Sequence, residues 1–431
     1  MDPSPASFSP RPQRASQPAR YAAVRAATER LAAPLSPEDC AAQSMPDASP
    51  VKWHLAHTSW FFETFVLEVA QPGYRPFDPA FRALFNSYYQ TVGEPYARPR
   101  RGLLTRPSLA EVTAYRAHVD RHLMEVLRRG VDGVLAAVME LGLNHEQQHQ
   151  ELILTDVKHL LAQSPLRPAY RGDLPAEAGA QMPVAQRWHR FAAGIRGIGV
   201  EPAAATFHFD NEAPRHRVWL GAFELASRPV TQREYLAFMA DGGYARAELW
   251  LAEGWDTVRS QGWQAPAYWE RRGDAWVEFT LGGLRPLALD APACHLSYFE
   301  ADAFARWAGA RLPTEAEWET AAAGVAVDGN LLDADRLHPT PAAPPASGDV
   351  PQQLFGDVWE WTASPYVAYP GYRPPAGALG EYNGKFMCGQ LVLRGGSALT
   401  PADHVRASYR NFFPPAARWQ MSGVRLARDC A

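Results

Sequence analysis

The spacing of apolar residues changes near residue 162, and this change constrains the fold more than any other feature of the sequence. Up to about Leu161, apolar residues recur every three or four positions, as in Val119-Leu123-Val126-Leu127 and Val138–Leu152, which is typical of amphipathic helices. The stretch that follows is rich in Pro and Gly and indicates a linker at about 166–190. A chain of 431 residues is also too long for one ordinary core. We therefore predict two domains of different classes.

The first domain is expected to be a four-helix bundle over residues 21–165. Its helical patterns include a first helix near Tyr21 to Leu31 and an aromatic helix around Trp60 to Leu67. Residues 1–20 contain many Pro, Ser and Arg and few apolar side chains, so we predict a disordered lead-in.

The second domain is expected to span residues 191–431 and to be an irregular α+β domain. It holds short β-like runs at 216–220 and 391–394, one clear helix at about 298–310, and many Gly, Pro and Trp. The predicted fold class of the whole chain is therefore α+β, with a helical bundle followed by a mixed domain.

Charge and cysteine content exclude several kinds of partner. Forty-two Lys and Arg against forty-six Asp and Glu give a net charge of -4, so we expect no bulk attraction to nucleic acid or to an anionic membrane. A small-molecule substrate is the better expectation. The four cysteines are far apart, and no apolar signal peptide or membrane span is visible. We expect a cytoplasmic protein with reduced thiols.

The segment Leu141–Leu152 contains the strongest candidate for a metal site. His145 and His149 are one helical turn apart and share a face, the spacing that lets two imidazoles reach one metal. On this spacing alone, hydrogen-bonded core histidines are an equally good interpretation. His118 and His122 repeat the spacing beside charged residues, where a solvated helix face is the better interpretation.

A third ligand is needed, and the bundle offers His54 and His57. These two are separated by three positions, so spacing does not choose between them. Three imidazoles suit Fe(II), Zn or Cu. The match to H-E-x-x-H also suggests a zinc hydrolase with Glu146 as general base, but the helical wheel turns Glu146 away from the face of His145 and His149.

Motifs in both halves resemble the EgtB family of ergothioneine-biosynthesis sulfoxide synthases, from about Leu35 onward. The first half is similar to the DinB-like bundle of that family in the segments 44–67, 84–109 and 142–161. The second half is similar to its formylglycine-generating-enzyme-like domain, a C-type-lectin-like fold, in DNEAPRHRV (210–218), GARLPTEAEWE (309–319), FGDVWEWTAS (355–364), LRGGS (393–397) and SGVRLAR (422–428).

The resemblance implies an iron enzyme with His57, His145 and His149 as the ligands of Fe(II), and it makes His54 a neighbour. Such enzymes use O₂ to join a thiol sulfur to the imidazole C2 of hercynine (Nα-trimethylhistidine), as a sulfoxide. The thiol donor would be cysteine or γ-glutamylcysteine.

The same resemblance implies a hercynine pocket built by both domains. Gln148 matches the residue that hydrogen-bonds the hercynine imidazole, and Asn411 and Phe412 match positions near its carboxylate and trimethylammonium groups. An aromatic face suits a quaternary cation, although plain core packing is another interpretation of Phe412.

Tyr88 and Tyr89 match paired active-site tyrosines in one branch of the family. A phenol beside the metal can supply a proton or a hydrogen atom, which would direct oxidation toward C–S bond formation. Arg98 and Arg101 lie in the arginine-rich segment 98–106, and a guanidinium suits bidentate contact with the carboxylate of the thiol donor.

Two departures narrow the function. Ser397-Ala398 carries no cysteine at the place where a formylglycine-generating enzyme has its cysteine pair, which argues against that activity. Gly389 and Ala398 replace the Asn and Cys expected in relatives.

A selenoneine synthase, which joins selenium from a selenosugar to hercynine, is a related alternative. A non-catalytic lectin-like binding protein is an alternative from another class.

Overall fold

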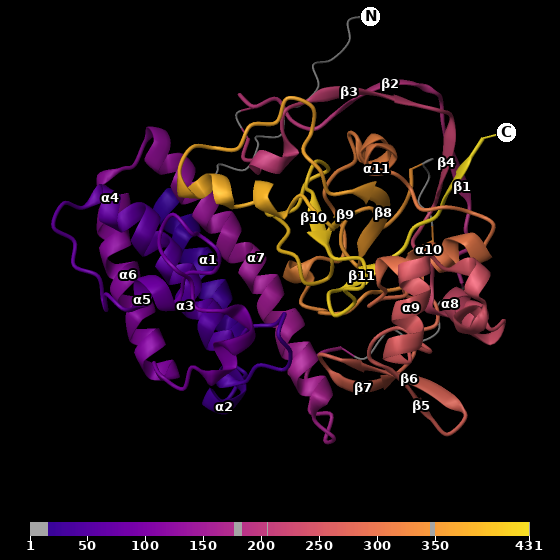
Figure 1. Ribbon diagram of the computed structural model, residues 1–431, viewed down its shortest axis with the longest axis horizontal. Helices are drawn as coiled ribbons and strands as arrows, with labels where there is room; N and C mark the ends of the chain where they lie inside the picture. The colour runs from indigo at the N-terminus through magenta and orange to yellow at the C-terminus, as the bar shows by residue number, and fades with distance from the viewer. Residues whose placement is uncertain (1–15, 176–182, 205, 345–349, 431) are drawn as a thin grey trace, which may run out of the picture.

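The computed structural model describes residues 16–175, 183–204, 206–344 and 350–430. Its first half is helical and its second half combines short strands and helices (Figure 1). The predicted α+β class and the division into a bundle and a mixed domain are confirmed.

Four long helices form the bundle, as predicted. They are α1 (Gln17–Ala32), α3 (Val51–Phe62), α6 (Leu109–Arg129) and α7 (Gly133–Gln163). Between them lie α2 (Pro37–Ala41), the π-helical turn η1 (Glu63–Leu67), α4 (Glu68–Ala70), α5 (Phe81–Leu84) and the 3-10 helix η2 (Arg98–Leu103). α3 packs against α6 and α7, and α1 packs against α7.

Local chemistry explains where these helices start and end. α6 begins at a capping box in which Ser108 and Glu111 satisfy each other's backbone N–H groups, and it stops at Gly130, whose φ is +90°. α1 begins at Gln17, earlier than expected, because Pro18 lies in the first turn, where the missing N–H costs nothing. Residues 17–20 of the predicted lead-in therefore belong to α1. Residues 1–15 lie outside the described residues.

The strands of the second domain form four small sheets. In the first sheet, β4 (Phe223–Ala226) lies between β1 (Trp188–Phe191) and β12 (Ala427–Asp429). The second sheet has the order β10 (Asn411–Phe413), β9 (Leu391–Arg394), β8 (Trp359–Pro365) and β11 (Ser422–Gly423). The other two sheets are the pair β2 (Gly194–Ile198) and β3 (His216–Leu220), and the meander β5 (Trp269–Arg272), β6 (Ala275–Thr280) and β7 (Gly283–Pro286). The neighbours in each sheet are antiparallel, except β8 and β11, which are parallel. The expected strands at 216–220 and 391–394 are confirmed as β3 and β9.

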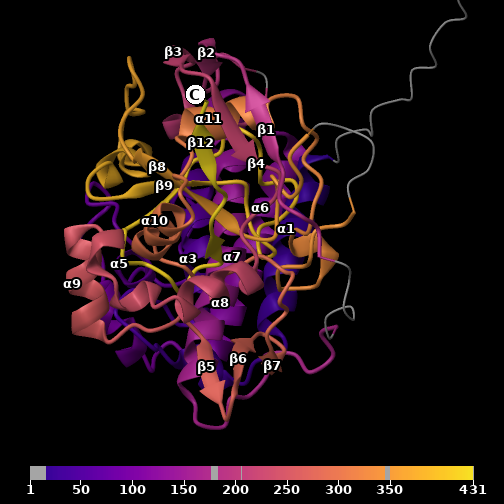
Figure 2. The same ribbon diagram turned by 90° about the vertical axis from the view of Figure 1, so that its right-hand side faces the viewer.

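Four helices in the described part of the chain accompany these sheets. They are α8 (Gln232–Ala240), α9 (Ala252–Gln261), α10 (Tyr298–Trp307) and α11 (Glu315–Ala322), with 3-10 turns η3 (Asp210–Glu212), η4 (Gly243–Ala245), η5 (Ala247–Leu249), η6 (Leu332–Ala334), η7 (Ala378–Glu381) and η8 (Gly384–Phe386). α11 packs against β2, β3, β8 and β9. The helix expected at about 298–310 is α10. Figure 2 looks onto this domain, with the bundle behind it.

The central strand β8 shows how the second domain tolerates buried charge. Trp359, Glu360 and Trp361 are all buried, because β8 lies between β9 and β11. The carboxylate of Glu360 is balanced by Arg425 at 2.6 Å and accepts a hydrogen bond from the indole of Trp318 at 2.7 Å.

Among the described residues, no helix is both long and apolar enough to cross a membrane.

Candidate metal centre

The middle of α7 is buried on every side, and each face contacts a different part of the protein. His145 and His149 face α3, whereas Glu146 forms ion pairs with Arg25 at 2.9 Å and Arg116 at 3.1 Å inside the bundle. The remaining face contacts the second domain, which Figure 1 shows lying beside α7. One helix therefore links the histidines to the domain interface.

The structure brings His57, His145 and His149 together. Their candidate ligand atoms all lie within 4.8 Å of one another, and the Nε2 atoms of His57 and His145 are 3.1 Å apart. The three residues are only 1%, 3% and 8% exposed. His54 is not part of this cluster among the described residues, so the choice that spacing left open falls on His57.

Hydrogen bonds orient two of these rings toward a common centre. The Nδ1–H of His57 donates to the carbonyl oxygen of Phe85 at 2.6 Å, which leaves its Nε2 lone pair free. Nδ1 of His149 lies 2.8 Å from Nδ1 of His54, so its Nε2 is also available. Facing lone pairs repel unless a cation lies between them, so this donor set fits a metal ion.

Burial also keeps these imidazoles neutral. It lowers the pKa of His57 and His149 well below the ordinary value, helped by the neighbouring histidines, and it lowers the pKa of His145 to about 3. Neutral imidazoles are the form that binds a metal.

Glu146 is poorly placed to act as the general base of a zinc hydrolase. Burial alone would raise its pKa, but the charges of Arg25 and Arg116 outweigh burial and lower it to about 2. Both carboxylate oxygens are held by these guanidinium groups, on the bundle side of α7. A base must be free to accept a proton, so the geometry argues against the hydrolase interpretation.

His118 and His122 lie elsewhere, on α6. Their rings contact each other and Tyr74, and Nδ1 of His118 lies 3.2 Å from a guanidinium nitrogen of Arg121. No third metal-binding side chain joins them among the described residues.

Gln148 connects the metal helix to two phenols of the second domain. Its Nε2 donates to the hydroxyl of Tyr409 at 2.7 Å, and its Oε1 accepts a hydrogen bond from Tyr382. The Tyr382 ring centroid also lies 5.7 Å from that of His145. Sequence reasoning missed both tyrosines; only the position of Tyr409 beside the Arg410–Pro415 stretch hinted at its role.

Tyr88 and Tyr89 stack on each other, with ring centroids 4.6 Å apart. Tyr89 packs against Trp60, which itself stacks on His57. Tyr88 lies 6.5 Å from the ring of Tyr382. The paired tyrosines are thus one aromatic ring away from the histidine cluster on two sides.

Asn411 and Phe412 lie on β10 in the second domain. Phe412 stacks on Tyr366 with centroids 4.0 Å apart and also contacts Phe386, which in turn contacts Tyr88. The side-chain Oδ1 of Asn411 accepts a hydrogen bond from the backbone N–H of Phe412 at 2.9 Å. Aromatic rings therefore form a continuous path from Phe412 to the bundle.

The two candidate arginines differ sharply in burial. Arg98 is exposed, whereas Arg101 is 2% exposed and its guanidinium stacks on Trp53, which also stacks on His57. Within the described part of the chain, Nη1 is the only guanidinium nitrogen of Arg101 that makes a hydrogen bond; it donates to the hydroxyl of Ser49 at 2.9 Å. Burial lowers the pKa of Arg101, which means that an anion beside it would be stabilising.

A second contact between the domains surrounds Glu151 of α7. Its buried carboxylate accepts hydrogen bonds from Trp359, Ser397 and Thr400, each at 2.7 Å. Ser397 opens the segment where a formylglycine-generating enzyme has its cysteine pair. In this chain that hydroxyl instead holds the metal-carrying helix.

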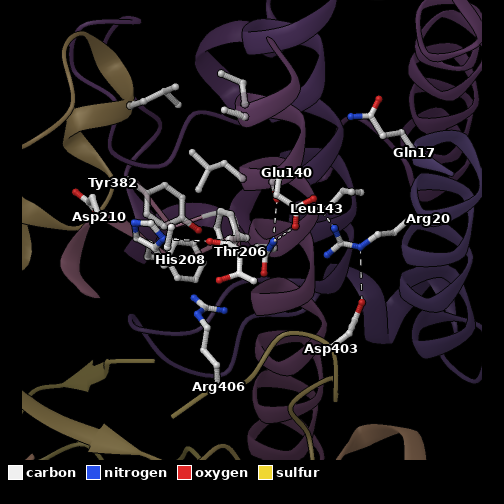
Figure 3. Close-up of a pocket in the computed structure, with 18 of the residues that line it drawn as sticks. Gln17, Arg20, Glu140, Leu143, Thr206, His208, Asp210, Tyr382, Asp403 and Arg406 are labelled. Atoms are coloured by element: carbon white, nitrogen blue, oxygen red, sulfur yellow. Dashed lines mark hydrogen bonds and ion pairs between the residues drawn. The ribbon is translucent and has the colours of Figure 1, made fainter. Parts of the chain in front are cut away.

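A cavity of about 1180 Å³ lies at the domain interface; Asn144 and Tyr382 line it, but the three histidines of the cluster do not. Figure 3 shows Tyr382 and Asp210 on one side of it, Glu140 and Arg20 on another, and Arg406 below. Tyr382 lines this cavity and its ring also contacts that of His145, so this side chain touches both the cavity and the histidine cluster.

The fold and the site together define a two-domain protein in which a helical bundle carries a three-histidine metal site against a mixed domain. Residues 20–153 match the DinB superfamily, and residues 190–340 and 335–430 match the sulfatase-modifying factor enzyme 1-like domain. The chain is 34% identical to the hercynine oxygenase of Mycobacterium tuberculosis, over 95% of this chain and 97% of that protein. It is 33% identical to that of Mycolicibacterium thermoresistibile, over 89% and 88%. The chain belongs to the hercynine oxygenase (EgtB) family, which confirms the resemblance seen in the sequence.

Proposed function

We propose that this protein is an Fe(II)- and O₂-dependent sulfoxide synthase that joins a thiol sulfur to the imidazole C2 of hercynine. The observation that carries this proposal is the buried cluster of His57, His145 and His149 in the bundle, next to the α7 residue Gln148 that contacts the second domain. Three neutral imidazoles that leave coordination positions open are a suitable donor set for Fe(II). Bound iron would supply the activation of O₂.

Residues around the cluster would bind and orient hercynine. Gln148 already uses both ends of its amide on Tyr382 and Tyr409, so a bound imidazole would replace one of these contacts. The aromatic face of Phe412 suits the trimethylammonium group, and the amide of Asn411 can donate to the carboxylate. The site therefore requires both domains.

Arg101 is the better candidate for the thiol donor's carboxylate. Its guanidinium is buried beside the metal-ligand helix and lacks an acidic partner at ion-pair distance in the described part of the chain, whereas Arg98 is exposed. An incoming carboxylate would balance a charge that burial otherwise destabilises. Arg101→Ala is expected to raise the KM for the donor much more than the KM for hercynine.

A phenol near the metal would deliver a proton or a hydrogen atom during C–S bond formation. Tyr88 and Tyr89 are the candidates from the sequence, and Tyr382 joins them because its ring contacts His145. Replacing the active phenol by Phe should leave metal binding intact and divert turnover toward oxidation of the thiol alone. Unchanged product ratios in all three Phe variants would contradict this role.

One experiment tests the proposed function as a whole. The full-length protein is reconstituted with Fe(II) without oxygen and then exposed to O₂ with hercynine and either cysteine or γ-glutamylcysteine. The reaction would consume one O₂ and release one water, so a product mass equal to hercynine plus donor plus one oxygen minus two hydrogens supports the proposal and identifies the donor. Formation of a C–Se product from a selenosugar only would indicate selenoneine synthesis. Binding of hercynine without O₂ uptake would indicate a non-catalytic binding protein.

A further inference from the structure

Within the described part of the chain, His149 is the histidine of the cluster whose Nδ1 contacts a side chain, that of His54. Its Nδ1 lies 2.8 Å from Nδ1 of His54, and Nε2 of His54 lies 3.1 Å from Oδ2 of Asp156. His54 and Asp156 are 2% and 6% exposed, so water does not compete for these contacts. By contrast, His57 is held by a backbone carbonyl, which no substitution can remove.

These contacts fix which nitrogen of each ring carries the proton. The carboxylate of Asp156 can only accept, so Nε2 of His54 must donate to it. When this is the one proton on the His54 ring, its Nδ1 is bare, and the 2.8 Å contact requires His149 to donate from its own Nδ1. The Nε2 of His149 is left with its lone pair, which is the form that binds a metal.

The same two helices that supply the cluster also supply these two residues. His54 lies one turn before His57 on α3, and Asp156 lies two turns after His149 on α7. The backbone N–H of Ser49 donates to Oδ2 of Asp156 at 2.8 Å and holds the carboxylate in place. Packing of α3 against α7 therefore sets the histidine cluster and the side chains behind it together.

We infer that His54 and Asp156 are positioning residues that hold His149 in its Nδ1–H tautomer and aim its Nε2 at the metal position. This inference rests on the proposed metal site. It adds two residues behind that site, whose effect is on metal affinity and on the tautomer of His149.

The test uses full-length protein freed of metal and titrated with Co(II), whose absorption spectrum reports on its ligands. His54→Ala is expected to weaken Co(II) binding 10- to 100-fold and to change the spectrum, while the stoichiometry stays at one ion. Asp156→Asn keeps the shape and should give an intermediate loss. Added imidazole should restore affinity to His54→Ala, because it can occupy the space that the lost ring leaves beside His149. His122→Ala, a histidine lost from α6, is the matched control and should bind like the wild type.

A second measurement needs no metal. Nitrogen-15 NMR of histidine-labelled metal-free protein should show His149 as the Nδ1–H tautomer in the wild type and a shift toward Nε2–H in His54→Ala. Co(II) binding and a His149 tautomer that are both unchanged in His54→Ala would overturn the inference. A wild type that binds no Co(II) would overturn the proposed metal site; with a tautomer shift in His54→Ala, only the assignment of the His149 tautomer to His54 and Asp156 would then stand. Thermal unfolding shows whether each variant folds. If His54→Ala does not fold, the Co(II) affinity and the His149 tautomer of Asp156→Asn test the inference instead.

Discussion

Two histidine pairs in one bundle have the same local geometry and very different surroundings. The ring centroids of His118 and His122 on α6 are 4.6 Å apart, and those of His145 and His149 on α7 are also 4.6 Å apart. A helix therefore produces the same pair wherever histidines are four residues apart.

The difference lies in what faces each pair. His145 and His149 meet the imidazole of His57 from another helix and are fully enclosed. His118 faces a guanidinium, that of Arg121, which would repel a metal ion, and it remains partly exposed. A metal site thus needs a third ligand across a helix interface and the exclusion of competing charge.

The most direct test of the difference between the two pairs is to remove one histidine from each pair and measure metal binding. His145→Ala is expected to weaken Fe(II) or Co(II) binding at least ~1000-fold, about 4 kcal/mol, since four-ligand zinc sites bind with about 10–16 kcal/mol in total. His118→Ala should leave the affinity unchanged. Competition titration with a chelating dye measures both, and equal losses in the two variants would refute the assignment of the metal to α7.

The buried charge behind the α7 pair gives the next largest effect. Glu146→Ala leaves the guanidinium groups of Arg25 and Arg116 without their shared buried carboxylate, and should lower the free energy of unfolding by about 3–5 kcal/mol. Glu125→Ala, at an exposed position of α6, is the control and should cost less than about 0.5 kcal/mol. Urea unfolding of the metal-free proteins measures the difference. A cost near that of the control would mean that the ion pairs contribute nothing.

Acid should weaken the anchoring of α7 in a defined pH range. The pKa of Glu146 falls from its ordinary value of 4.5 to about 2 in the folded protein, so its stabilising contribution is complete above about pH 4.5 and is lost as the pH falls toward 2. The difference in unfolding free energy between wild type and Glu146→Gln should therefore shrink over this range. A difference that stays constant from pH 5 to pH 2.5 would contradict the assigned shift.

The smallest effect is expected for the α6 pair itself. His122→Ala removes a partly exposed ring that packs against Tyr74, and it should change the free energy of unfolding by no more than about 1 kcal/mol. Thermal unfolding with and without added Co(II) measures this. The stabilisation by metal should be the same as in the wild type; loss of that stabilisation would show that α6 contributes to the metal site.

Regular spacing made part of this protein predictable. The apolar period predicted the bundle, β3 and β9 were visible as short apolar runs, and His145 and His149 followed from one helical turn. Asp156 was also detectable in principle, because it lies two turns beyond His149 on the same helix. Tyr382 gave no signal, since it reaches Gln148 across 234 positions of sequence from an irregular segment.

Patterns in the sequence were enough to predict the main helices of the bundle, the pairs of histidines that share a helix face, and the family that the motifs resemble. Spacing left His54 and His57 equal and the family resemblance favoured His57; the tertiary structure brings His57 into the cluster, places His54 behind His149, and shows that Arg101 is buried. Spacing along one helix fixes the relative directions of its own side chains. The rotation of one helix against another depends on how all their side chains pack together, and that packing decides which candidate ligands meet.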